Sequence, residues 1–134
     1  MTTGGLGVVR AWQLAVNGAS VADAVALTAR QVEVLGPRGE GLMLKQELGD
    51  WMVRSGFTAT PLRWFCGGDG TVVVEQDVRW VDRETGQERG RAVVASHFEV
   101  DDGVVSRIAR HDKGLQAALD SAGLSSADEV LDRA

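Results

Sequence analysis

Apolar and polar residues alternate along three stretches in the second half of this chain. The stretches read TVVVEQDVRWV, GRAVVASHFEV and VVSRIARHD, at residues 71–81, 90–100 and 104–112. Because successive side chains of a β-strand point to opposite faces, the alternation predicts strands that turn one face to a core. Turn sequences at 84–86 and 101–103 separate the stretches, so the pattern favours an antiparallel meander.

Apolar residues at helical spacing dominate the first half and return in the tail. They predict helices over residues 6–16, 21–29 and 41–54, and two short helical pieces over 113–123 and 125–133. Two further strands are expected. Residues 31–35 alternate and end at the turn-rich sequence GPRG, and residues 57–66 read as an extended segment. Pro61 removes a ladder donor from that segment and favours an edge position or a bulge.

The order helix, helix, strand, helix and then four antiparallel strands is typical of an α+β protein, with helices packed on one face of a sheet. The chain has 134 residues, 44% of them hydrophobic, which suits a single domain over 1–134. Cys66 is the only cysteine, so no disulfide within the chain is expected. The sequence has neither a signal-peptide pattern nor a membrane-spanning stretch, and we expect a cytoplasmic protein with no membrane partner.

The formal net charge of −5 argues against nucleic acid as a partner, because phosphate binding relies on clustered Lys and Arg. The densest basic interval, 79–91, also contains Asp82, Glu84 and Glu88, and is better explained as a solvated hairpin. The spacing of His97 and His111 matches no standard ligand motif, so no metal site is expected, and no cofactor is expected either.

The element order, together with RQVEVLGPRGEG before the third helix and HFEVDDGVVSRIARHD near the end, resembles the nuclear-transport-factor-2-like (NTF2-like) superfamily and its SnoaL-like group. The resemblance covers a core of residues 6–112, followed by the helical tail 113–134. It implies a cystatin-like cone, in which a curved antiparallel sheet wraps around the N-terminal helices and encloses a pocket. Members include isomerases, polyketide cyclases, epoxide hydrolases, dehydratases and non-catalytic binding proteins, so the fold does not decide the function.

The catalytic positions that this resemblance implies are not filled here. Isomerase-like members carry a general-base Asp in the first strand, where this chain has Val34 and Leu35. They also carry a carboxylic acid two residues before the Phe of the penultimate strand, where Ser96 precedes Phe98. A serine cannot replace a carboxyl group in that role, and the chain contains no tyrosine to act as the oxyanion donor of the isomerases.

Epoxide hydrolase-like members use an Asp, Arg and Asp set, in which the Arg and one Asp lie two apart on a strand. The nearest equivalents here, Glu75 and Asp77, replace the Arg with an acid. Asp112 lies near the end of the last strand, and with His111 it is a candidate catalytic residue in a rebuilt site. His111 is the best single acid-base candidate, since an imidazole titrates near neutral pH.

Strand parity indicates which residues line the pocket. By the parity of the family, Gln76 and Ser96 are the few polar groups of an apolar interior, able to bind a carbonyl or hydroxyl of a ligand. The alternative is that they satisfy each other or buried backbone, as most buried polar side chains do. Tryptophans on helices and strands either line the pocket or simply fill the core. The predicted ligand-binding set is Trp12, Trp51, Gln76, Trp80, Ser96 and Phe98.

Apolar residues on the other face of the sheet suggest a partner surface. We expect a symmetric homodimer, as in many members of the superfamily. The predicted interface is Val73, Asp77, Arg79, Val93, Ala95 and His97.

Two main functional classes follow from these observations. The first is a small-molecule-binding protein with an apolar pocket, without turnover. The second is a divergent isomerase, cyclase or dehydratase acting on an apolar cyclic or polyketide-like substrate. A third is a structural dimerisation module whose own tryptophans fill the cone. An ionisable group beside the reacting atoms of a ligand would distinguish the enzyme from the others.

Overall fold

The computed structural model describes residues 4–36, 39–68 and 70–130. Its elements are α1 (Gly4–Asn17), α2 (Val21–Ala26), β1 (Thr28–Gly36), β2 (Gly39–Leu44), α3 (Lys45–Arg54), β3 (Phe57–Cys66), β4 (Thr71–Val81), β5 (Glu88–Asp101), β6 (Val104–His111), α4 (Leu115–Ala122), η1 (Ser126–Asp128) and β7 (Glu129–Val130). The strands form one sheet in the order β2-β1-β6-β5-β4-β3-β7. The expected α+β class is confirmed.

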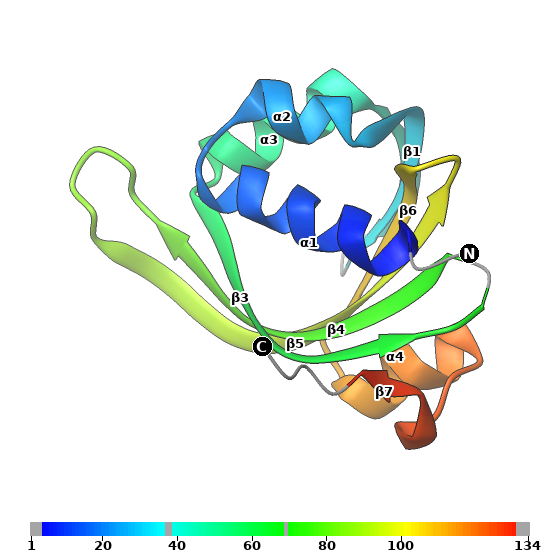
Figure 1. Ribbon diagram of the computed structural model, residues 1–134. Helices are drawn as coiled ribbons and strands as arrows, with labels where there is room; N and C mark the ends of the chain where they lie inside the picture. The colour runs from blue at the N-terminus through cyan, green and yellow to red at the C-terminus, as the bar shows by residue number, and fades with distance from the viewer. Residues whose placement is uncertain (1–3, 37–38, 69, 131–134) are drawn as a thin grey trace.

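The sheet curves around the N-terminal helices (Figure 1). Helices α1, α2 and α3 lie on its concave side, whereas α4 lies against its convex side. Within the described residues β1 pairs with β6 in parallel, and the remaining strand pairs are antiparallel. The parallel β1–β6 pairing makes the sheet an open, mixed cone and not the purely antiparallel one that was expected. The sequence pattern gave no indication of this pairing.

The second helix is shorter than its pattern predicted. It ends at Ala26, and the residues up to 29 leave the helix to begin β1. Thr28 marks the change, since it pairs with Val105 of β6 and its hydroxyl donates a hydrogen bond of 2.7 Å to the carbonyl of Ala24. The β-branched Thr28 suits a strand better than a helix. The strand β1 is consequently longer than the predicted 31–35.

The predicted helix 41–54 is wrong in its first residues, because Gly39–Leu44 form the strand β2, antiparallel to β1. Glycines at 39 and 41 disfavour a helix, and Leu42 and Leu44 fit the two-residue period of a strand. The helix α3 begins at Lys45. The side chain of Glu47 accepts a hydrogen bond of 2.9 Å from the backbone N–H of Leu44 and fixes this start.

The strand β3 and the tail agree with the sequence patterns in part. The register of β3 against β4 shifts between Pro61 and Arg63, which confirms the expected bulge. The predicted helix 113–123 is α4. In place of a helix at 125–133, the chain forms the short turn η1 and the strand β7, which pairs with the edge of β3. Residues 131–133 lie outside the described part of the chain.

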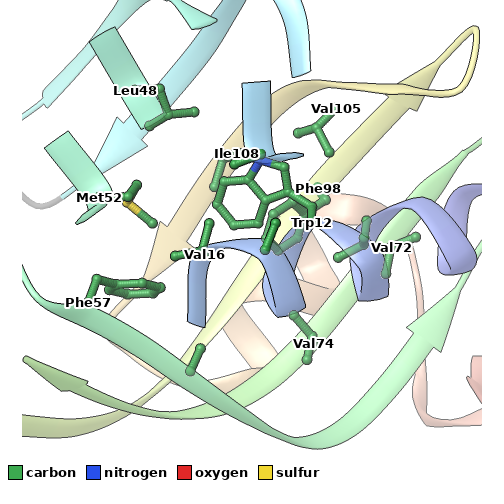
Figure 2. Close-up of a cluster of buried hydrophobic side chains, with 14 of the residues drawn as sticks. Trp12, Val16, Leu48, Met52, Phe57, Val72, Val74, Phe98, Val105 and Ile108 are labelled. Atoms are coloured by element: carbon green, nitrogen blue, oxygen red, sulfur yellow. The ribbon is translucent and has the colours of Figure 1, made fainter. Parts of the chain in front are cut away.

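The main core lies between the three N-terminal helices and the concave face of the sheet. Figure 2 shows Trp12 of α1 at its centre, surrounded by side chains from α3 and from the strands. A second cluster lies on the convex face, where α4 packs Ala118 and Leu119 against Phe65, Val73 and Ala95. The sheet is thus covered on both faces over this region.

Candidate ligand-binding cavity

A small cavity opens between α1, α3 and the concave face of the sheet. Its volume is about 90 Å³. Helix α3 contributes residues three and four positions apart, and β5 and β6 each contribute two residues of one parity, because those spacings share a face. Strand β1 contributes the adjacent Val34 and Leu35 near its end. The lining residues are Trp12, Val34, Leu35, Leu48, Trp51, Met52, Phe57, Gln76, Ser96, Phe98, Ile108 and Arg110.

Trp12 forms a fixed wall of this cavity. Its indole N–H donates a hydrogen bond of 3.1 Å to the hydroxyl of Thr28, so the polar end of the ring is satisfied inside the core. The ring meets Phe98 edge to face, with centroids 5.5 Å apart. Trp12 is only 2% exposed. It therefore acts both as a core residue and as a lining residue, and the two interpretations of this tryptophan do not exclude each other.

Gln76 and Ser96 are the uncharged polar side chains of the lining, and they satisfy each other in part. The Ser96 hydroxyl donates a hydrogen bond of 2.9 Å to Oε1 of Gln76, and both residues are buried. No hydrogen bond from Nε2 of Gln76 is present within the described residues. A side-chain amide carries two N–H donors, so Gln76 keeps donor capacity at the cavity.

Arg110 also lines the cavity, and the sequence reasoning missed it. Its guanidinium donates to both carboxylate oxygens of Asp112, at 2.8 and 3.2 Å, and lies 5.6 Å from the ring centroid of Trp80. Arg110 is the only ionisable residue lining the cavity in the described part of the chain. Ile108 and Arg110 lie two residues apart in β6 and therefore point to the same face of the sheet. The alternation along β6 would have identified Arg110 as a lining residue if the inward face of the strand had been known.

His111 does not reach the cavity. It follows Arg110 in β6 and pairs with Ala95, whose side chain belongs to the convex cluster under α4. Burial lowers the pKa of His111 from its ordinary value, and the nearby His97 and Arg107 act in the same direction. Its Nε2 is buried and has no partner within the described residues. Of the two catalytic candidates, only the exposed Asp112 is connected to the cavity, through its ion pair with Arg110.

Five of the six predicted ligand-binding residues line the cavity, and Trp80 does not. Trp51 is half-exposed and lies at the mouth of the cavity. Trp80 lies with Trp51 in a neighbouring groove, and its ring contacts Phe57 of the cavity wall edge to face, with centroids 6.1 Å apart. Trp64, the remaining tryptophan, is buried in the main core.

The convex face is covered by the chain itself where a partner was expected. Val73, Ala95 and His97 are almost completely buried beside α4. His97 contacts the carboxylate of Glu99, and its Nδ1 lies 3.3 Å from the hydroxyl of Ser121 in α4. The prediction that Val73, Ala95 and His97 lie at a dimer interface is therefore wrong, because the tail helix α4 occupies that surface.

The other three predicted interface residues lie beyond the edge of α4. Val93 is 58% exposed. Asp77 accepts hydrogen bonds from Arg91 at 3.2 and 2.8 Å, and it forms a longer ion pair with Arg79. The hydrogen bond from Arg91 lowers the pKa of Asp77 below its usual range. This charged, partly apolar area is the part of the convex face that remains accessible.

The positions at which the sequence resemblance implies catalytic acids face the cavity without a carboxylate. Val34 and Leu35 line it where isomerase-like proteins carry their base, and Ser96 lines it where they carry their second acid. In the described part of the chain no group of His, Cys, Asp or Glu is arranged to hold a metal ion. None of the described helices is long and apolar enough to cross a membrane.

Comparisons with known proteins assign the fold. No family model matches the sequence, and no curated protein matches it. Among solved structures, an NTF2-like protein of unknown function from Cytophaga hutchinsonii aligns with a TM-score of 0.68 at 14% identity, over 80% of this chain and 88% of that one. The epoxide hydrolase/cyclase-like enzyme SalBIII, with a role in pyran ring formation in the polyether salinomycin, aligns with a TM-score of 0.68 at 15% identity, over 96% and 95%.

A candidate ketosteroid isomerase from Kribbella flavida aligns with a TM-score of 0.65 at 20% identity, over 80% of this chain and 76% of that one. At these identities the likeness is one of fold. The chain therefore has the NTF2-like, cystatin-like fold that its sequence resembles.

Proposed function

We propose that this protein binds a small apolar molecule carrying a carbonyl or hydroxyl group, without chemical turnover. The observation that carries the proposal is the composition of the cavity lining. Arg110 is its only ionisable side chain among the described residues, and Arg110 already forms an ion pair with Asp112. An apolar site with a few convergent polar groups is the usual form of a small-molecule site. In this proposal the ligand oxygen accepts a hydrogen bond from Nε2 of Gln76.

The size of the cavity limits what enters it. A volume of about 90 Å³ is well below the 300 Å³ or more of typical drug-sized sites. It accepts a ring or a short branched chain, and a longer ligand extends past the half-exposed Trp51. We therefore expect a monocyclic apolar group to occupy the cavity.

Native mass spectrometry of the freshly purified protein, followed by denaturation, tests for a copurified ligand. Titration with cyclohexanone, monitored by tryptophan fluorescence, tests the site directly. We expect Val34→Phe to abolish the fluorescence change because the larger side chain fills the cavity, and Gln76→Met to weaken binding about tenfold because it removes the donor. Val93→Phe is the matched control, since it adds the same ring on the exposed convex face. Equal binding by Val34→Phe and wild type would exclude the cavity.

An enzymatic role is the second candidate, supported by the ion pair of Arg110 and Asp112. Arg110 lies near the end of β6 and Asp112 follows that strand by one residue, and the fold neighbour SalBIII is an epoxide hydrolase/cyclase-like enzyme. In this proposal Arg110 holds Asp112 at the mouth as a general base or acid for a divergent cyclase, isomerase or dehydratase acting on an apolar cyclic or polyketide-like substrate. Incubation with cyclohexene oxide tests whether this pair opens an epoxide: diol formation that is lost in Asp112→Asn supports an enzyme, and absence of diol excludes epoxide opening by this pair.

We further propose that any homodimer uses the accessible part of the convex face. Asp77, Arg79 and Val93 remain available there, since α4 covers the other predicted interface residues. Exposed apolar area among charges of both signs suits a two-fold contact. Its test is the mass of the protein in solution, measured by light scattering.

A further inference from the structure

A second hollow lies directly beside the mouth of the cavity. It is an open groove of about 540 Å³ between the end of α3 and the β4–β5 hairpin. Its lining consists of Trp51, Arg54, Ser55, Trp80, Arg89 and Gly90. The absence of a side chain at Gly90 leaves Trp80 uncovered, because a Cβ there would lie 3.4 Å from Cε3 of the indole.

The groove carries positive charge in a chain whose formal net charge is −5. Two of its lining residues, Arg54 and Arg89, are arginines, and none is acidic. Neither arginine forms an ion pair with a carboxylate in the described part of the chain. Arg89 interacts only at longer range with the carboxylate of Asp82. Guanidinium groups beside indole rings are suited to an organic anion, since arginine binds carboxylates through paired N–H donors.

Backbone contacts hold both arginines at the groove. Arg89 donates a hydrogen bond of 3.0 Å from Nη2 to the carbonyl of Ser55, and Arg54 donates one of 3.3 Å from Nε to the carbonyl of Asp50. The bond from Arg89 also satisfies the carbonyl of Ser55, the C-cap residue of α3, which is a structural role in its own right. A guanidinium has five N–H donors, however, and each arginine uses only one of them here.

The groove is continuous with the cavity through aromatic residues. Trp51 lines both hollows. Trp80 lines the groove and contacts two lining residues of the cavity, Phe57 and Arg110. A ligand whose apolar ring fills the cavity and whose chain passes Trp51 therefore reaches a space lined by Arg54 and Arg89, neither of which has a direct carboxylate contact within the described residues.

From this arrangement we propose that the ligand is an amphipathic carboxylate. Its apolar ring occupies the cavity, and its carboxylate lies in the groove between Arg54 and Arg89. The proposal rests on the proposed binding function and adds the charge of the ligand to it. The exposure of the groove limits each ion pair to a modest contribution, so the two arginines together raise affinity about tenfold over a neutral analogue.

Calorimetric titration with 4-cyclohexylbutanoate and with its methyl ester tests the proposal, because the two probes share the ring and chain and differ in charge. We expect wild type to bind the carboxylate about tenfold more tightly than the ester, and added NaCl to weaken only the carboxylate. Arg54→Gln/Arg89→Gln should remove the preference. Arg30→Gln/Lys113→Gln changes the net charge equally at exposed sites elsewhere and should retain it. Arg54→Gln alone, which loses a single carbonyl contact, provides the test if the double variant does not fold.

The outcomes separate this inference from the proposed function. If neither probe binds and cyclohexanone does not bind either, the apolar site itself is wrong. If cyclohexanone binds and neither probe does, the cavity stands and the amphipathic carboxylate is excluded. If the ester binds and the carboxylate binds no more tightly, the cavity stands and the anionic ligand is excluded. If the double variant without Arg54 and Arg89 still prefers the carboxylate probe, the carboxylate group binds elsewhere. That result would overturn the role of the groove.

Discussion

The two faces of the same sheet are closed in different ways. On the concave face, α1 and α3 pack large side chains such as Trp12 over the strands and leave a cavity with an open mouth. On the convex face, the small Ala118 and the adjacent Leu119 of α4 pack closely over Val73 and Ala95. Charged and titratable groups, among them His97 and Glu99, lie on this second face.

Because the two faces are closed differently, the residues proposed to affect ligand binding lie on the concave face, whereas residues of the convex face contribute to stability alone. On the concave face Trp12 and Phe98 meet edge to face and line the cavity, together with the polar Gln76. Small residues on a helix allow close approach to a sheet and leave no room for a ligand. We therefore expect substitutions on the concave face to alter both stability and binding, and those on the convex face to alter stability alone.

The largest effect is expected for Trp12→Ala. The change removes the most central side chain of the concave core and leaves a large cavity there, so the free energy of unfolding should fall by about 3–5 kcal/mol. Urea denaturation measures it. Leu14→Ala in the same helix is the control, because Leu14 is 72% exposed and its loss should cost less than about 0.5 kcal/mol. Similar losses for the two variants would contradict the central place of Trp12.

Leu119→Ala on the convex face is expected to cost about 2–3 kcal/mol, because Leu119 is buried in a smaller cluster. Binding of cyclohexanone at a temperature where the variant is folded should be unchanged. The exposed Leu62→Ala serves as the comparison for denaturation. If Leu119→Ala weakens binding as much as a cavity substitution does, the separation of the two faces fails.

Much of the concave face was predictable from local pattern. Alternation along β4 and β5 placed Gln76, Ser96 and Phe98 on one side, and the cavity has them there. Helical spacing placed Trp12 and Trp51 correctly for the same reason, since periodicity records which side chains share a face. The contacts between Gln76 and Ser96 follow from neighbouring strands, and the sequence interpretation had already raised them as an alternative to ligand binding.

Long-range packing was not predictable in this way. An amphipathic pattern in the tail does not indicate which surface the tail covers. The sequence therefore did not predict that α4 packs on the convex face, and Val73 was expected to contact a partner subunit. The sequence also did not determine which alternate residues of β6 face the cavity. His111 was therefore chosen as the acid-base candidate, and Arg110 was not considered. The strand β2 was missed because its few residues precede a true helix without a break in apolar spacing.

Titration of His111 gives a smaller, pH-dependent effect on the convex face. The folded pKa of His111 is lowered by burial and by the adjacent His97 and Arg107, opposed by Asp112. Between that lowered pKa and the unfolded value near 6.5, the unfolded chain binds more protons, so stability falls as the pH drops through this window. Above the window the penalty is absent, and below it the penalty is constant.

Urea denaturation from pH 7.5 to acidic pH measures this dependence. His111→Gln should show a shallower loss of stability than wild type, because glutamine does not titrate. Lys113→Gln is the control, since an exposed lysine stays charged throughout the window and its curve should parallel that of wild type. Parallel curves for all three proteins would remove His111 as a source of the pH dependence.

The smallest effect on stability is expected for Val93→Glu, at less than about 0.5 kcal/mol, because Val93 is 58% exposed within the monomer. Its effect on assembly should be large if the uncovered part of the convex face forms the dimer, since a buried carboxylate without a partner opposes association. Light scattering should then report a dimer for wild type and a monomer for the variant. Val93→Thr keeps the shape without the charge and should remain dimeric. A dimer that survives Val93→Glu would exclude this surface, and a monomeric wild type would leave α4 as the sole partner of the convex face.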